Sequence, residues 1–414
     1  MISALKDIWT IFSIEVRRVF GDWTVLLIFF LAPILYPFIF CFIYHNENVE
    51  NMPIAVVDEA RSADSKRFIH KLDATPELTV AYRCSNLGEA RRLMDGHEVR
   101  SIFYFPEDFS QRLAEKRTAR VVVFSDMSSF YFYKAALTGG NAVLIDEMHT
   151  IELQRYKQAG LSDEEAQVQM QPVVMENTTL FNPTGGYGSF FLPCLMVLVM
   201  HQTLFLGICI LIGDARENRK SLRLIPSHLR RASIHRVTFG RSLCYLLIYV
   251  PLCILDLWFI PRWFNLPQLG NLYTILIFCL PFLLATIFFA MTVGNLLVRQ
   301  KISPMLCFVF FSLVLFILSG MVWPQESMPR LWYLFSYLFP STPGVQGYIK
   351  IASMGAQLSE VRHEYMTLWI QAAVYFSAST LILSARLLLR RRRNIIVHSL
   401  RRQQQAVVQW QKKH

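Results

Sequence analysis

The chain has 414 residues, of which 53% are hydrophobic and 17% are charged. This composition is too apolar for an ordinary soluble protein and too charged for a chain buried entirely in a membrane. The sequence therefore predicts one soluble domain together with a set of membrane spans. The net charge of +11 does not indicate nucleic-acid binding, because the basic residues flank apolar runs and lack interleaved aromatic residues for base stacking. Anionic membrane lipid is the expected partner of these residues.

The charges divide between two parts of the chain. Residues 46–186 carry 15 Lys and Arg against 21 Asp and Glu, whereas the rest carries 26 against 9. Of those 26 basic residues, 22 lie in four short stretches, namely 1–18, 216–241, 299–301 and 386–414. Short cytoplasmic loops retain Lys and Arg, but long domains cross the membrane largely regardless of their charge. We therefore expect both termini in the cytoplasm and the acidic block outside it.

The N-terminal segment predicts an amphipathic helix that lies in the membrane interface. Apolar residues recur at helical spacing, with the charged ones largely elsewhere on the helical wheel. The apolar set is Leu5, Ile8, Trp9, Phe12, Val16 and Val19, and the charged set is Lys6, Glu15, Arg17 and Arg18. The alternative is a plain cytoplasmic extension of the first span.

The acidic block has the pattern of an α/β domain. Strands are predicted at 52–58, 78–82, 101–105 and 120–125, and they alternate with helices at 62–72, 86–96 and 107–117. Such alternation indicates that at least part of the sheet is parallel. A helical region follows over 130–170, broken near Gly160, and an extended segment over 172–181 leads back to the membrane.

Six apolar runs are near the length of about 20 residues that a bilayer core demands. They predict spans at 23–45, 188–212, 239–260, 272–298, 303–323 and 366–389. An even number agrees with two cytoplasmic termini. The remaining segments are an interfacial helix at 1–22, an extracytoplasmic α/β domain at 46–187, a cytoplasmic loop at 213–238, short interfacial helices at 324–365 and a basic, mobile tail at 390–414. The predicted fold is a polytopic α-helical membrane protein with an inserted α/β domain.

No motif for catalysis or nucleotide binding is recognised in the sequence. The dipeptide Gly-Lys does not occur, which excludes a P-loop, and there is no H-E-x-x-H or G-x-S-x-G motif. The sequence predicts a protein that is not an enzyme and that needs no cofactor or metal of its own.

Polar residues inside spans are candidates for function, because burying them in lipid is costly. His201 and Gln202 lie near the middle of the second span, where either a hydrogen bond between helices or a ligand contact would explain them. Asp256 is predicted near the outer end of the third span. There it would either face the interface close to Arg262 or contact a substrate or proton.

The basic loop at 214–236 mixes its charges with apolar residues such as Leu222, Leu224, Ile225 and Leu229. A loop that only binds lipid would not need them. We therefore expect short helices that dock onto a soluble partner, and a solvated loop is the alternative.

Three stretches of the chain stand out as motifs. They are MPIAVVDEARSADSKRFIHKLDATPEL at 52–78, the run from Arg216 to Leu222, and LSGMVWPQESMP at 318–329 followed by FPSTPG. Together they resemble the type-2 permease class of ABC exporters, in its bacterial drug- or lipid-exporter-like branch with a large domain between spans one and two. The family usually reads R-E-x-E-x-G-T-L-E at the second stretch. This chain instead has Arg219, Ser221 and Arg223, a departure that would fit the divergent member of a permease heterodimer.

The resemblance implies the permease subunit of an ATP-driven exporter in a bacterial inner membrane. ATP would be bound by a separate cytoplasmic ATPase subunit, and a second permease copy or a paralogue would complete the dimer. A periplasmic adaptor is a further candidate partner. The resemblance assigns coupling to the ATPase to Arg216, Glu217, Arg219, Ser221, Leu222, Leu224 and Ile225, and an outer gate region to Gly320, Pro324, Pro329, Pro340 and Pro343.

The substrate is not identified by these residues. Spans rich in Phe, with 32 in the chain, suit an amphipathic drug- or lipid-like molecule better than an ion. The alternative function is a scaffold subunit that docks an extracytoplasmic partner and transports nothing. An ion-coupled transporter would need paired carboxylates or broken helices at mid-membrane, and Asp256 alone is weak support for one.

Overall fold

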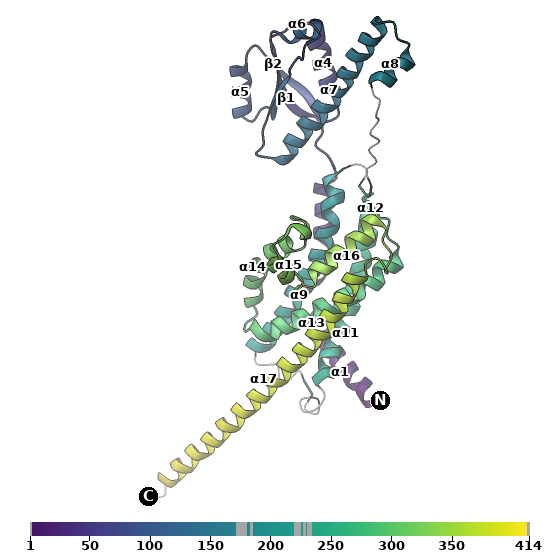
Figure 1. Ribbon diagram of the computed structural model, residues 1–414. Helices are drawn as coiled ribbons and strands as arrows, with labels where there is room; N and C mark the ends of the chain where they lie inside the picture. Colours follow the sequence, from purple (N-terminus) through teal and green to yellow (C-terminus); the bar gives the residue numbers. More distant parts are fainter. Residues whose placement is uncertain are drawn as a thin grey trace. The chain divides into compact units, whose positions relative to one another are not determined.

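The computed structural model describes residues 2–170, 180–182, 185–218, 225–226, 229 and 234–411, and at 2–3, 163, 170, 306–311 and 390–411 it describes the backbone only. Two compact units form (Figure 1), one from residues 1–45 with 188–414 and the other from residues 46–187. The first is a helical bundle and the second an α/β unit. The predicted extended segment at 172–181 lies almost wholly outside the described residues.

The bundle is built from helices throughout the part that the structure describes. Its elements are α1 (Ile2–Phe20), α2 (Trp23–Leu26), the π-helix η1 (Leu27–Leu31), α3 (Ala32–Ile43), α9 (Tyr187–Glu217), α11 (Ile234–Ile254), the π-helix η3 (Leu255–Phe259), α12 (Ile260–Trp263), α13 (Leu272–Leu297), α14 (Ser303–Leu318), the 3₁₀ turn η4 (Gln325–Ser327), α15 (Arg330–Ser336), α16 (Ser341–Met354) and α17 (Arg362–Gln411).

Five helices among the described residues are long and apolar enough to cross a membrane. They are Trp23–Ile43, Tyr187–Glu217, Ile234–Trp263, Leu272–Leu297 and Arg362–Leu389. The chain is therefore a multi-pass α-helical membrane protein. The remaining predicted span, 303–323, corresponds to α14, whose 16 residues end at Leu318 because Gly320 turns the chain with a φ of +85°. That sixth span stays a prediction.

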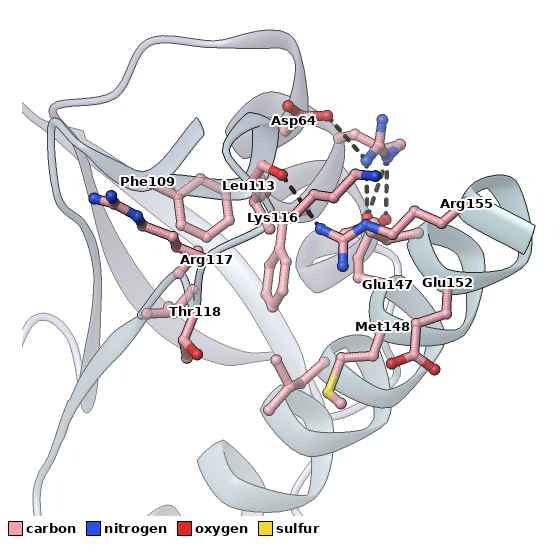
Figure 2. Close-up of a pocket in the computed structure, with 16 residues that line it drawn as sticks. Asp64, Phe109, Leu113, Lys116, Arg117, Thr118, Glu147, Met148, Glu152 and Arg155 are labelled. Carbon is pink, nitrogen blue, oxygen red and sulfur yellow. Dashed lines mark hydrogen bonds and ion pairs between the residues drawn. The ribbon is translucent and has the colours of Figure 1, made fainter. Parts of the chain in front are cut away.

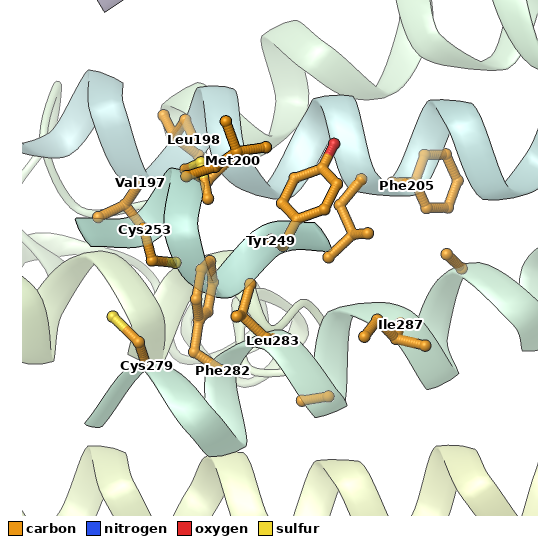
Figure 3. Close-up of a cluster of buried hydrophobic side chains, with 14 of the residues drawn as sticks. Val197, Leu198, Met200, Phe205, Tyr249, Cys253, Cys279, Phe282, Leu283 and Ile287 are labelled. Carbon is orange, nitrogen blue, oxygen red and sulfur yellow. The ribbon is translucent and has the colours of Figure 1, made fainter. Parts of the chain in front are cut away.

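The core of the bundle lies where α9, α11 and α13 meet. Figure 3 shows Val197, Met200 and Phe205 from α9 beside Tyr249 of α11 and Phe282 of α13. Lipid tails are as apolar as these side chains, so helix association in a membrane depends on close packing and on small residues at the contact. In α16, Gly344 and Gly347 allow Phe282 and Phe278 of α13 to approach so closely that an added Cβ would lie 2.5 and 2.2 Å from the rings.

The α/β unit contains one four-stranded sheet in the order β2-β1-β3-β4. Its elements are β1 (Met52–Asp58), α4 (Ala63–Asp73), β2 (Leu78–Cys84), α5 (Leu87–Asp95), β3 (Ser101–Phe105), α6 (Phe109–Ala114), β4 (Val122–Ser125), α7 (Phe130–Gln158) and α8 (Asp163–Met170). β1 pairs in parallel with both β2 and β3, and β4 closes the edge antiparallel to β3. The break between α7 and α8 contains Gly160, with a φ of +91°.

Both faces of the sheet are covered, which explains why β1 reads as a continuous apolar run. Ile54 and Val56 point into a core formed with α4, α6 and α7. Ala55 and Val57 point into a second core formed with α5. The helix α4 begins at a capping box, in which the Ser62 hydroxyl accepts from the Ser65 backbone N–H and the Ser65 hydroxyl accepts from the Ser62 N–H.

Glu147 on α7 joins that helix to α4. Its side chain is only 5% exposed and pairs with Arg67 at 3.0 Å and Lys71 at 2.6 Å. Burial alone would raise the pKa of this carboxyl, but the hydrogen bonds from Arg67 and Lys71 outweigh burial and lower the pKa below its ordinary value of 4.5. A lowered folded-state pKa stabilises the protein above the unfolded pKa, and this stabilisation is lost as the pH falls through the folded value.

We therefore expect acid to loosen the contact between α4 and α7. Amide hydrogen exchange of the full-length protein should show faster exchange in these helices as the pH falls below about 4.5, after correction for the intrinsic pH dependence of exchange. In the Glu147→Gln variant this acid-dependent increase should be much smaller, because the buried titrating group is gone and only the exposed Asp146 still pairs with Lys71 across the contact. Glu152→Gln, at an exposed position of the same helix, is the matched control and should behave as the wild type. Equal acid sensitivity in all three proteins would contradict the expectation.

The C-terminal tail is helical as far as the structure describes it. α17 continues as one helix of 50 residues to Gln411 and extends past the other helices of the bundle (Figure 1), and the predicted mobility of 390–414 stays a prediction. Arg, Gln and Leu are good helix formers, and a helix already nucleated by a membrane span propagates through them at little cost.

Candidate functional site

The candidate site is the set of contacts that joins α1 to the last turn of α9, the first turns of α11 and residues 299–301. We call it the α1 junction. Ile11 on α1 packs with Val237 on α11, and both are buried. Gly240 permits this contact, because a Cβ there would lie 2.8 Å from the Ile8 carbonyl oxygen. The helix α1 is therefore seated directly on α11.

A buried carboxylate organises the centre of the α1 junction. Glu15 is 1% exposed and lies between two arginines, Arg18 at 2.7 Å and Arg241 at 3.3 Å. The Tyr245 hydroxyl donates a further hydrogen bond to Glu15. A buried ion pair is tolerated only when its groups are neutralised and hydrogen-bonded, and these contacts meet that condition.

The charges of this network keep Glu15 ionised. Burial by itself would raise the pKa of the carboxyl, but the nearby Arg18 and Arg241 and the hydrogen bonds from Tyr245 and Arg18 outweigh it, so the pKa is lowered. The stabilisation is present above the unfolded-state pKa and is lost as the pH falls through the lowered folded value. At neutral pH the network is therefore fully formed.

Polar contacts extend from α1 to α9. Arg18 donates to the Leu211 carbonyl at 2.5 Å, and Asp22, just after α1, pairs with Lys301 at 2.6 Å. The Lys301 backbone N–H in turn donates to the Glu217 carboxylate at 2.8 Å. A chain of contacts thus runs from α1 through residue 301 to the last residue of α9.

Further contacts tie neighbouring helices to the α1 junction. Asp7 pairs with Arg236 near the start of α11 at 2.9 Å. Arg216 donates to the Asn295 carbonyl at the end of α13, and Arg386 of α17 donates to the carbonyl of Leu296. The end of α9, the start of α11, the end of α13 and the middle of α17 are therefore held together with α1 in one region.

The predicted coupling residues are partly described. Arg216 and Glu217 lie in the last turn of α9, and the Glu217 side chain is exposed apart from its contact with residue 301. Ile225 is 1% exposed and packs with Leu229 and the α1 residue Ile11. The remaining predicted coupling residues, Arg219, Ser221, Leu222 and Leu224, lie outside the described residues.

Two apolar residues of the loop after α9, Ile225 and Leu229, lie in a different environment from the one predicted. Apolar residues in this loop are predicted to face a soluble partner, but these two are buried against α1 and α11 of their own chain. Their apolar character is thus explained by packing within the bundle. It no longer distinguishes a coupled permease from a scaffold.

The residues of α1 lie in two environments. Leu5 and Trp9 are 61% and 64% exposed, whereas the charged Glu15 is buried. The helical wheel alone could not show the burial of Glu15, because it depends on Arg241 and Tyr245 of α11, which are distant in sequence. The outward Leu5 and Trp9 suit contact with a membrane interface.

The polar residues predicted inside spans are found in different environments. His201 is fully buried beside Phe205 and Phe289, and neither ring nitrogen has a hydrogen-bond partner among the described residues. Gln202 is half-buried. The structure does not give His201 the predicted hydrogen bond between helices.

Asp256 is fully buried within η3, and its carboxylate oxygens likewise have no hydrogen-bond partner among the described residues. Arg262 stacks over the Trp258 ring at 4.7 Å, and both alternatives for Asp256 stay predictions. A π-helical turn often marks a functional position.

The residues predicted for the outer gate lie at helix boundaries. Pro324, Pro329 and Pro340 immediately precede η4, α15 and α16, respectively. Proline suits these positions because its fixed φ begins a helix and its missing N–H is not needed there. Pro343 is buried in the first turn of α16, and Gly320 supplies the turn after α14.

Sequence reasoning missed most of the α1 junction. Residues 299–301 are predicted only to anchor the bundle on lipid, whereas Lys301 makes a specific ion pair with Asp22 and a hydrogen bond to Glu217. The spacing of Glu15 and Arg18 was the one local signal, since residues three apart share a helix face. The contacts with Arg241 and Tyr245 required the tertiary structure.

Comparison with known proteins identifies the family of the chain. Residues 23–381 match the family model described as ABC-2 family transporter protein. No curated protein matches the chain.

Proposed function

The chain belongs to the ABC-2 transporter family, and we propose that it is the permease subunit of an ATP-driven exporter, coupled to a separate ATPase subunit at the α1 junction. The exported molecule is amphipathic, drug-like or lipid-like. A second permease copy or a paralogue completes the transmembrane pathway, and an ABC ATPase supplies the energy from the cytoplasm.

The continuity of the α1 junction carries this proposal. Arg18 donates directly to α9, and Lys301 joins Asp22, just after α1, to the last residue of α9. Glu15 extends the same network to Arg241 of α11. An ATPase that pushes on α1 or on the loop after α9 would therefore move both helices together. The exposed Glu217 at the end of α9 is a direct contact point for such a partner.

The proposed topology follows from the charge distribution. Six spans, with α14 as the fifth, leave both termini and the loop after α9 in the cytoplasm of a bacterial cell and residues 46–187 outside it. The α1 junction is then on the cytoplasmic side, where the ATPase resides. The acidic α/β unit would be available to a periplasmic adaptor.

The scaffold alternative makes a different prediction about energy coupling. A scaffold would retain its fold and its extracytoplasmic partner but would leave the activity of any ATPase unchanged. A scaffold could also contain the helix contacts of the α1 junction. The permease and scaffold functions are therefore distinguished by ATPase stimulation and not by packing.

Reversing the charge of Glu217 tests the proposal. We expect Glu217→Arg, co-expressed with the ATPase encoded nearest to its gene and reconstituted in liposomes, to lose ATPase stimulation by at least about tenfold, equivalent to about 1.4 kcal/mol. The reason is that Arg at this position would repel the basic residues around it and any basic groove on the ATPase. The readout is phosphate release with and without the permease.

Glu217→Gln is the matched control. It keeps a carbonyl oxygen that can accept from the Lys301 N–H, so it should retain the fold and most of the stimulation. It should also give the wild-type melting temperature within error, because the position is exposed and the hydrogen bond from residue 301 is kept. Full stimulation by Glu217→Arg would remove Glu217 from the coupling contact, and no stimulation by the wild-type chain would favour a scaffold.

A further inference from the structure

A polar cavity of about 590 Å³ lies between η4, α15, α16 and the first turns of α17. This volume is in the range of small-molecule sites. Its lining carries three acidic residues, Glu326, Glu360 and Glu364, against the two cations Arg330 and Lys350. Tyr333 and Tyr337 line it as well, and the Tyr333 hydroxyl donates to that of Tyr337 at 3.3 Å.

A buried carboxylate, that of Glu364, lines this cavity. Glu364 is 5% exposed, and its Oε1 pairs with the Lys350 ammonium at 2.6 Å. Its Oε2 has no hydrogen-bond partner among the described residues. A buried acceptor left without a donor costs free energy, more so when it is charged, so a ligand that supplies an N–H donor at this point would be bound favourably.

A cation at the cavity edge complements this acceptor. Arg330 begins α15, where its side chain is exposed and lines the cavity. A guanidinium is suited to a phosphate because it presents several donors in one plane. The cavity thus offers an acceptor for an ammonium group and a donor set for a phosphate group.

The outer surface of α15 is strongly apolar next to the cavity. Its exposed side chains are Leu331 (76%), Trp332 (53%), Leu334 (61%) and Phe335 (41%). Tyr333 and Tyr337 lie on the other side of the same short helix and line the cavity. The helix therefore separates a polar cavity from a surface that suits acyl chains, an arrangement typical of a membrane interface.

We propose that this cavity binds the zwitterionic headgroup of a membrane lipid, with its primary ammonium on Glu364 and its phosphate on Arg330. The acyl chains lie along the apolar surface of α15. The assignment goes beyond the proposed export function, since it requires neither an ATPase nor transport. Both a headgroup and a free amine offer the ammonium, but only the lipid also uses the apolar surface.

Binding of short-chain lipids to the purified full-length protein tests this proposal. Native mass spectrometry from detergent would compare dihexanoyl phosphatidylethanolamine with dihexanoyl phosphatidylglycerol, which carries a phosphate but no ammonium. Free phosphoethanolamine is the third probe. We expect the ethanolamine lipid to bind roughly tenfold or more tightly than the glycerol lipid, since one charge-assisted hydrogen bond accounts for that difference. It should also bind more tightly than phosphoethanolamine, which has no acyl chains to contact the apolar surface of α15.

Two variants locate the site, and a third is a control. Glu364→Gln should lower affinity for the ethanolamine lipid by roughly tenfold and leave the glycerol lipid unchanged. Arg330→Gln, at an exposed position, should weaken both lipids and keeps the test valid if Glu364→Gln does not fold. Glu164→Gln, an exposed acid in the α/β unit, should change neither affinity.

Each contrary result overturns a defined part of the proposal. Equal binding of the two lipids would remove the ammonium contact. Phosphoethanolamine binding as tightly as the lipid would remove the role of the apolar surface and indicate a soluble amine. Unaltered binding in both pocket variants would place the lipid elsewhere.

Discussion

Replacement of Glu15 with alanine is expected to have the largest effect on the fold of any single change in the α1 junction. It would leave Arg18 and Arg241, each only 13% exposed, without their shared carboxylate. Breaking a buried ion pair by removing one partner costs about 3–5 kcal/mol. We expect a lower melting temperature in detergent and faster hydrogen exchange along α1.

Arg17→Ala is the matched control, because Arg17 is an exposed residue of the same helix. It should leave both measurements within error of the wild type. A triple variant in which Glu15, Arg18 and Arg241 all become leucine should recover stability, since an apolar replacement of a whole buried ion pair is often neutral or stabilising. If Glu15→Ala and Arg17→Ala were alike, the network would not hold α1 in place.

Gly240→Leu is expected to separate α1 from α11 without altering any charge. Even a Cβ would lie 2.8 Å from the Ile8 carbonyl oxygen and 3.0 Å from the Ile11 Cβ, so the α1 backbone must move. Overpacking of this kind costs about 1–3 kcal/mol. Under the proposed function, ATPase stimulation should fall to the level without permease, because a displaced α1 no longer transmits movement to α11.

Phe239→Leu tests the neighbouring position, whose side chain is 48% exposed, and it should change neither stability nor stimulation. A pair of cysteines, one in α1 and one in α11, would report the displacement through loss of cross-linking in Gly240→Leu. Cross-linking at the wild-type rate would show that α1 remains seated. The steric argument would then fail, whatever the activity.

Local patterns were sufficient for the α/β unit. Its four strands, its capped helix after Ser62 and the break at Gly160 are each specified by residues close together in the chain, such as the Ser62 hydroxyl and the Ser65 N–H. The antiparallel direction of β4 was not specified locally. It depends on pairing with β3, a contact that leaves no periodic signature in the strand itself.

Hydropathy identified membrane-spanning helices for a similar reason. Every residue of a span must suit the same apolar solvent, so the signal accumulates along about 20 consecutive residues. The family resemblance, carried by three short stretches, agrees with the match over residues 23–381. The end of α14 at Leu318 was missed because apolar residues continue past the turn at Gly320.

The sequence by itself determined that this is a polytopic membrane protein, because hydropathy acts on each segment separately, and three short stretches carried its resemblance to the permease class. Only the tertiary structure decided how the helix ends are joined. Glu15, on the polar side of a helical wheel, is buried because Arg241 and Tyr245 reach it from α11. Lys301 belongs to the same region because Asp22 lies beside it. Such pairings are set by three-dimensional proximity, and the free energy of a buried charge depends on its neighbours and not on its position in the chain.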